Sequence, residues 1–270
     1  MLMLKRTHKR IEENMLNKLL VNGRVFCLLL LALILSLYGA WMVNAKLGYG
    51  YSWLYGFYET EQHIAYYAPQ NRYRQGFETT SVAEHKYVFQ QIVDSVHADG
   101  EGLADISYQY SGKTIPLLHQ AERIHLQDVA NLINFIHSLA MVCLLLFIIC
   151  FAWEFRHRGN KHTPSKTQFS QDASPVGLLS VFALLLAFMA AAFFIWGAKA
   201  IFYQMHILVF PEDHQWFFYY QDSLMSTLMK APDLFAGIAV QIVLVAVILY
   251  AVILLVIKKL LALAKTAQDS

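Results

Sequence analysis

Three titratable residues, Glu122, His125 and Asp128, occur at three-residue spacing in the stretch ERIHLQDVANLI. On a helix, His125 would lie within about 60° of each carboxylate, so that all three share one broad face. An aspartate near a histidine can hold one imidazole tautomer and favour the protonated ring. The pattern is typical of general acid–base chemistry, but it also fits a solvated helix end with an intrahelical ion pair.

A second group of titratable residues lies among aromatic side chains in the segment 203–225. Acidic groups packed among aromatic rings are costly unless they are paired or used. The segment therefore indicates either part of a site or an aromatic membrane anchor with a few solvated polar groups. Its polar members, and the tryptophan beside them, are His206, Glu212, Asp213, His214, Trp216 and Asp222.

Two histidines from these groups, if brought together, could catalyse acyl transfer. One imidazole would take a proton from a nucleophile while the other donates to a leaving group or an oxyanion. Alternatively, His125, Asp128, His206 and Asp213 could ligate zinc or another divalent ion, as in a metal-dependent membrane hydrolase. The sequence has no GxSxG, Walker or HExxH motif, so serine hydrolases, NTPases and zincins lack support.

The elements that must position these residues are apolar helices. The chain is 57% hydrophobic and 15% charged over 270 residues, which is too apolar for a soluble domain of this length. Crossing a bilayer takes about 20 mostly apolar residues. Four segments qualify, and we expect them to be transmembrane helices: 25–43, 134–153, 175–198 and 234–257.

Basic residues set the expected orientation of these helices. Residues 1–24 hold six Lys or Arg, the loop 154–174 holds four and the tail 258–270 holds three. The loops 44–133 and 199–233 carry more Asp and Glu than Lys and Arg. By the positive-inside rule, both termini and the loop 154–174 are cytoplasmic, and the two acidic loops are extracytoplasmic. The net charge of +2 suggests no nucleic-acid partner.

The first extracytoplasmic loop is too long to be a passive connector. Ser81 and Glu84 fit a capping box, which predicts a helix near 81–96. The stretch around Gly112 indicates a short hairpin or a loop. A helical pattern resumes after Pro116 and predicts one helix from about His119 through Trp153. The expected fold class is therefore an all-α membrane protein, a four-helix bundle with a large first extracytoplasmic loop that contains a helix.

With these motifs in hand, the chain resembles an integral membrane family that includes the bacterial lipoprotein intramolecular transacylase. Members have four spans, a large first outward loop and an E-x-x-H-x-x-D-V signature before the second span. Glu122, His125, Asp128 and Val129 match that signature. A histidine after the third span, followed by Asp, Trp and Asp, is matched in order by His206, Asp213, Trp216 and Asp222.

This sequence also departs from the family pattern in its second motif. Met205 replaces the usual Phe before the histidine, and Trp216 is displaced by about one residue. The proline expected before the second Asp is absent. The second motif is thus more divergent than the first, while the general layout extends over most of the chain.

The resemblance implies transfer of an acyl chain within a diacylglyceryl-modified lipoprotein, from the glycerol sn-2 oxygen to the amine of the N-terminal cysteine. It implies that His125, with Asp128, is the general base and that His206 assists the leaving alkoxide or the oxyanion, although the two roles could be exchanged. Glu122, Asp213, Trp216 and Asp222 would be supporting residues. The resemblance also implies a bacterial inner-membrane location.

No metal, nucleotide or other cofactor is expected from this resemblance, and no soluble acyl donor is required. The expected partner is a membrane lipid or a lipidated protein. A third interpretation, besides the transacylase and the metal-dependent hydrolase, is a non-enzymatic membrane partner or assembly protein whose outward loop binds another protein.

Overall fold

The computed structural model describes residues 2–158, 187, 191, 194–197 and 199–269. The predicted cytoplasmic loop 154–174 and the predicted third span 175–198 lie almost entirely outside the described residues. Within the described part, three helices contain stretches long and apolar enough to cross a membrane. These stretches are Gly23–Lys46, Gln120–Arg156 and Asp233–Leu263.

The three long helices are α1 (Leu2–Lys46), α5 (Gln120–Arg158) and α9 (Asp233–Asp269). The segments 25–43, 134–153 and 234–257, which the sequence marked as spans, each lie inside one of them. Such long runs of apolar side chains indicate membrane association, because exposing them to water is unfavourable and the hydrocarbon core of a bilayer removes them from water.

The chain forms two compact units, each of which is described by itself. The first unit comprises 1–39, 140–187 and 245–270. Its buried core is formed by side chains of α1 and α9, and Phe147 and Phe151 of α5 pack against it. Ala32 and Ser36 are fully buried there. The Ser36 hydroxyl donates to the Ala32 carbonyl at 2.7 Å, so this buried polar group is satisfied within α1. The main buried side chains are Leu28, Tyr250, Leu254, Ile257 and Leu261.

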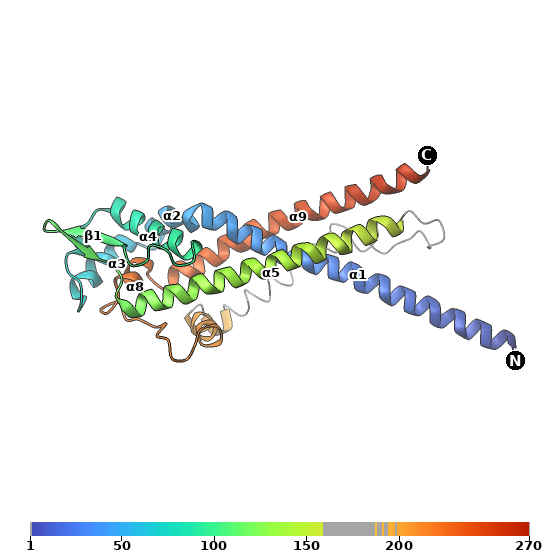
Figure 1. Cartoon of the computed structure of the whole chain (residues 1–270), viewed down its shortest axis with the longest axis horizontal. Coiled ribbons are helices and arrows are strands. Elements are labelled where there is room, and N and C mark those ends of the chain that lie inside the picture. Colours follow the sequence, from blue (N-terminus) through green and yellow to red (C-terminus); the bar gives the residue numbers. More distant parts are fainter. Residues whose placement is uncertain (1, 159–186, 188–190, 192–193, 198, 270) are drawn as a thin grey trace. The chain divides into compact units, whose positions relative to one another are not determined.

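The second unit comprises 40–139 and 188–244 and contains most of the short elements. Figure 1 shows them gathered around the beginning of α5. They are α2 (Tyr51–Phe57), α3 (Thr60–Tyr67), α4 (Val82–His97), β1 (Ser107–Tyr110), β2 (Lys113–Pro116) and α8 (Leu224–Met229), with short 3₁₀ turns at Gly48–Gly50, Ala68–Gln70 and Phe77–Thr79.

Helix α4 begins as its sequence indicates, because the Ser81 hydroxyl accepts a hydrogen bond from the backbone N–H of Glu84 at 3.1 Å. The capping-box pattern predicted that the Glu84 carboxylate would accept from the backbone N–H of Ser81, but in the structure it bonds elsewhere. It accepts from the backbone N–H of Gln109 at 3.2 Å and so ties α4 to β1. The apolar face of α4, including Phe89 and Ile92, is buried.

The two strands β1 and β2 form an antiparallel hairpin at the stretch around Gly112, within a described chain that is otherwise mostly helical. Tyr110 pairs with Lys113 across the turn, and the two turn residues, Ser111 and Gly112, have φ of 50° and 76°. Positive φ at both positions is the geometry of a two-residue type I′ turn. The hairpin is anchored by Tyr108, whose buried ring packs edge-on against Phe77 at 5.1 Å.

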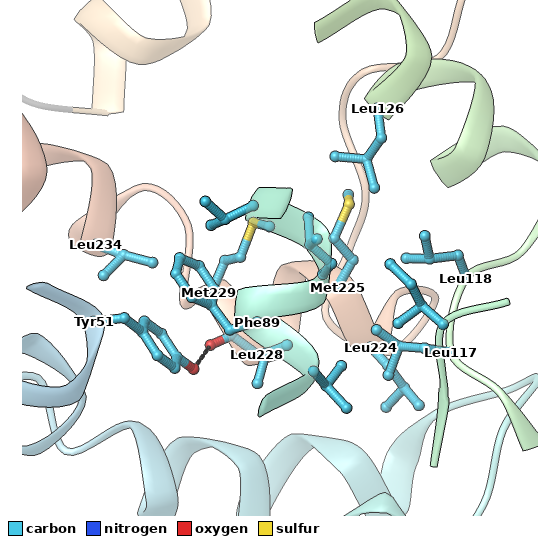
Figure 2. Close-up of a cluster of buried hydrophobic side chains, with 14 of the residues drawn as sticks. Tyr51, Phe89, Leu117, Leu118, Leu126, Leu224, Met225, Leu228, Met229 and Leu234 are labelled. Carbon is cyan, nitrogen blue, oxygen red and sulfur yellow. Dashed lines mark hydrogen bonds between the residues drawn. The ribbon is translucent and has the colours of Figure 1, made fainter. Parts of the chain in front are cut away.

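Helix α8 is the centre of the second unit's core. All six of its residues are buried, and Leu228 is completely enclosed. Figure 2 shows the Tyr51 hydroxyl donating to the Leu228 carbonyl, a bond of 2.7 Å. The same tyrosine stacks on Phe89 of α4 with ring centroids 3.8 Å apart. This packing holds α2, α4, α5 and α8 together and fixes the surroundings of the α5 N-terminal turns.

Candidate active site

The first histidine of interest, His125, lies on α5 about one turn after the helix begins, and only 7% of it is exposed. The residues on the same helical face are Leu126 and Val129, which pack in the core of the second unit. The ring of Phe210 stands edge-on to the His125 imidazole at 4.8 Å. His125 thus points into the apolar interior of the unit and not into solvent.

The second histidine, His206, comes from a helical segment at 199–209. Its ring centroid lies 5.8 Å from that of His125, with the planes inclined by 35°. It is 6% exposed, and Trp216 packs against its ring at 5.0 Å. The fold therefore brings together two imidazoles that are far apart in the chain.

The tautomer of His206 follows from its hydrogen bond. Its Nδ1 lies 2.7 Å from the backbone carbonyl oxygen of Phe202. A carbonyl oxygen can only accept, so Nδ1 carries the hydrogen, and in the neutral ring the Nε2 lone pair is free. Burial lowers the pKa of His206, partly offset by the bond to Phe202. This side chain is therefore a neutral base at ordinary pH.

His125 is held differently. Its Nδ1 is buried and has no hydrogen-bond partner among the described residues. Aromatic rings surround the imidazole, with Phe218 at 6.1 Å in addition to Phe210. A buried polar atom without a partner is costly, and a substrate that hydrogen-bonds to it would recover that cost.

A cavity of about 360 Å³ opens beside the two imidazoles. Its volume is in the usual range for a small-molecule site. The imidazoles are among the few polar groups in its wall, which draws on the end of α1, the turn Gly48–Gly50, α4, α5, α8, α9 and the segment 199–218. The apolar side chains around the histidines include Leu126, Val129, Phe202, Val209, Phe218 and Met225. Such a cavity suits a hydrocarbon chain whose reactive end carries a polar group.

Asp128 does not contact His125, contrary to the pairing expected from the H-x-x-D spacing. Its Oδ2 instead lies 2.7 Å from Nδ1 of His214, which donates to it. This bond raises the pKa of His214, and the charges of Asp128 and Asp213 act in the same direction. The reason is the turn of the helix between the two residues. His125 faces the cavity, whereas the side chain of Asp128 faces the loop that carries His214.

Glu122 is completely buried, but it also does not contact His125. One carboxylate oxygen accepts from the hydroxyl of Ser223, and the other accepts from the backbone N–H of His119 at 2.7 Å. Ser223 is in turn the N-cap of α8, since it accepts from the N–H of Ser226 at 2.9 Å. Glu122 therefore joins the start of α5 to the start of α8.

The other residues carried over from the family pattern have separate surroundings. Trp216 lines the cavity beside His206. Asp213 is exposed and lies with the His214 pair. Asp222 forms an ion pair with Arg72 at 3.0 Å. Of the seven residues selected from the sequence, the structure places His125, His206 and Trp216 on the cavity and leaves the four carboxylates outside it.

Sequence reasoning missed the partners of these carboxylates. His214 was noted in the second cluster without a role and Ser223 was not noted, and each bonds a carboxylate more than eighty positions earlier in the chain. Local spacing carries no signal for such pairs.

The possible metal ligands do not form one set. His125 and His206 lie on the cavity, whereas Asp128 bonds His214 and Asp213 is exposed. In the part of the chain that the structure describes, no three His, Cys, Asp or Glu side chains form a group that could hold a metal ion.

Comparison with known families gave one match. A family model described as lipoprotein intramolecular transacylase Lit matches residues 24–231, more than half of the 270-residue chain. The matched range contains both histidines, Trp216 and all four carboxylates. No curated protein and no solved structure matched the chain.

Proposed function

The chain belongs to the lipoprotein intramolecular transacylase family, and we propose that it moves an acyl chain within a diacylglyceryl-modified lipoprotein. The acyl group leaves the glycerol sn-2 oxygen and is received by the amine of the N-terminal cysteine. The observation that carries this proposal is the pairing of two imidazoles, 5.8 Å apart, on the wall of an apolar cavity. The cavity supplies a place for the chain, and the imidazoles supply the proton transfers.

His206 is the general base in this proposal. Its Nε2 lone pair is free because Nδ1 donates to Phe202, and its lowered pKa keeps the ring neutral. It removes a proton from the cysteine ammonium, so that the amine can attack the ester carbonyl carbon. This assignment reverses the roles first implied by the resemblance, because Asp128 supports His214 and not His125.

His125 serves the oxygen side of the reaction. A carbon–nitrogen bond forms as the amine attacks, and the carbonyl oxygen becomes an oxyanion, which an imidazole N–H can stabilise. The carbon–oxygen bond to glycerol then breaks, and the alkoxide takes a proton. His206 releases the proton of the ammonium to water and then takes the proton that the attacking nitrogen loses. His125 gives its N–H proton to the alkoxide and regains one from His206, so the transfer is balanced and needs no second substrate.

The apolar wall contributes to rate and to selectivity. The ester and the amine belong to one molecule, and holding both near the imidazoles makes their encounter an oriented, unimolecular event. Water would compete with the amine for the ester carbonyl. Aromatic side chains such as Phe210 and Phe218 pack against His125 and limit its access.

The substrate is anchored in lipid, which suits a protein with membrane-spanning helices. We place it in the bacterial cytoplasmic membrane, with four spans, both termini cytoplasmic and the histidine pair on the outer side. The distribution of Lys and Arg along the chain supports this orientation. The three apolar helices support the location.

The test is turnover of a synthetic diacylglyceryl lipopeptide by the purified protein in lipid nanodiscs, followed by mass spectrometry of the N-terminus. The wild-type protein should convert the O-acyl form to the N-acyl form of equal mass, with or without a chelator. His206→Gln and His125→Gln should each lower kcat roughly 100-fold or more. Tyr66→Phe, at an exposed residue outside the cavity, is the matched control.

The proposal fails if the wild-type protein leaves the acyl pattern unchanged. It also fails if both histidine variants fold and retain full turnover. Loss of turnover on chelation, restored by one divalent ion, would favour the metal-dependent hydrolase instead.

A further inference from the structure

One side of the cavity is lined by α5. The lining residues on this helix are His125, Leu126, Val129, Leu132, Ile133 and Ile136. Their spacing places them on one helical face, and eleven residues separate the first from the last. At about 1.5 Å per residue, the lined face is about 16 Å long. The imidazole pair stands at one end of this length and Ile136 at the other.

Trp41, near the end of α1, stands at the end of the cavity remote from the catalytic histidines. It lines the cavity, and its ring centroid lies 5.7 Å from that of His137, the residue after Ile136. The ring of His97 packs on the indole from another side at 5.3 Å. The position of the indole is therefore defined by contacts with both α4 and α5.

The His97 side chain is itself fixed. Its Nε2 lies 2.9 Å from the hydroxyl of Tyr49, which also lines the cavity. Ile242 of α9 also lines the cavity. A tryptophan supported in this way cannot move aside easily, because packed interiors resist changes in volume.

We propose that Trp41 closes the far end of the cavity and so sets the length of the acyl chain that the protein transfers. The inference rests on the proposed function, since it takes the reacting ester to lie at His125 and His206. With the carbonyl carbon held there, the tail can follow the apolar face of α5 only toward Trp41. A chain that is too long meets the indole, and a chain that is too short leaves part of the wall unfilled.

The chain that occupies the cavity is the transferred one and not the other acyl chain of the same glycerol. The carbonyl that reacts must touch the imidazoles, and its own tail is the hydrocarbon attached directly to it. Each methylene buried in such a wall changes affinity by roughly fourfold, so selection by length should be measurable.

The experiment uses pairs of diacylglyceryl lipopeptides in which the sn-2 and sn-1 chain lengths are varied independently. Two peptides that differ only in sn-2 length compete for the full-length protein in nanodiscs, and mass spectrometry gives the ratio of their kcat/KM values. Trp41→Ala should shift this ratio toward the longer sn-2 chain by roughly 10-fold or more. Changing sn-1 length should leave the ratio unaltered.

A second variant tests the opposite direction. Ile133→Trp adds volume on the lined face nearer to the histidines than Ile136 and should shift preference toward shorter sn-2 chains. Trp53→Ala removes an exposed tryptophan of α2 and is the matched control, with no shift expected. If Trp41→Ala does not fold, Trp41→Phe opens less space and should give a smaller shift in the same direction.

Direct binding of the same lipopeptides separates this inference from the proposed function. If the wild-type protein binds them without turnover, the proposed function fails, and the inference is still judged by whether Trp41→Ala moves the chain-length optimum of binding. Unchanged length preference in folded Trp41→Phe and Ile133→Trp variants would overturn it. So would a shift that follows sn-1 length.

Discussion

The two cavity histidines differ in how their hydrogen-bonding groups are committed. Nδ1 of His206 is bonded to the Phe202 carbonyl, so the lone pair of the neutral ring is on Nε2, whereas Nδ1 of His125 has no partner among the described residues. A fixed tautomer makes a reliable base, and an unbonded ring can adapt to an oxyanion or a leaving alkoxide. The carboxylate that the sequence motif places nearby serves neither ring, since Asp128 bonds His214.

Asp128→Asn should therefore lower kcat less than 10-fold, far less than loss of a histidine base. The pKa of His214, now raised by Asp128, should fall toward its ordinary value, as an NMR titration would show. His214→Gln should have the same small kinetic effect, and the double variant should add nothing further. A loss in Asp128→Asn as large as that in His125→Gln would mean that Asp128 acts on the catalytic pair after all.

The pH profile of kcat/KM should report the pKa at which His206 loses its proton and becomes able to act as the base. A general base acts above its pKa, and burial lowers the pKa of this histidine below the ordinary value of about 6.5. The acid limb belonging to the enzyme should therefore lie below that value. The substrate amine, which titrates near about 8, should give a separate limb that is unchanged in enzyme variants. An enzyme limb above the ordinary histidine value would contradict this assignment of the base.

At the scale of elements, the site depends on how α5 and α8 are joined. Helix α8 is six residues long, and a helix of that length is not stable by itself. It is held by complete burial and by Ser223, which both caps α8 and donates to the buried Glu122. Since Glu122 also bonds the start of α5, this contact sets the position of the turn that carries His125.

Two N-cap serines provide a matched stability test. Ser81→Ala removes the cap of α4 at an exposed position and should cost about 1 kcal/mol of unfolding free energy. Ser223→Ala removes a buried cap and also one of the partners of Glu122, so it should cost about 2 to 4 kcal/mol. Reversible unfolding in mixed micelles would measure both, and equal losses would show that the Glu122 bond adds little.

At the scale of the whole molecule, orientation decides whether lipoproteins can reach the site. In the proposed four-span topology both termini lie on one side of the membrane, and the Lys and Arg counts favour the cytoplasm as that side. The residues between α1 and α5 would then be extracytoplasmic, with the histidine pair close to the outer membrane surface.

Cysteine labelling tests this orientation in intact spheroplasts. In a background without Cys27, Cys143 and Cys150, Glu59→Cys should react with a membrane-impermeant maleimide. Lys265→Cys, in the tail, should react only after the membrane is opened. Labelling of the tail in sealed spheroplasts would contradict the proposed topology. The site would then lie on the side of the membrane that exported lipoproteins do not reach.

The sequence by itself determined the features that depend on neighbours along the chain. Apolar runs located α1, α5 and α9, and Ser81 located the start of α4, because burial and capping act over a few residues. The signature around His125 identified the family for the same reason. For the stretch around Gly112, the sequence indicated either a hairpin or a loop, and the structure has a hairpin there.

Only the tertiary structure decided which distant groups meet. Asp128 bonds His214 and Glu122 bonds Ser223, pairs set by where the loop 210–223 passes α5. The cavity and its closure by Trp41 likewise require side chains from several helices at once. Residue spacing encodes the faces of one helix, but loop paths and packing choose the partner that each face receives.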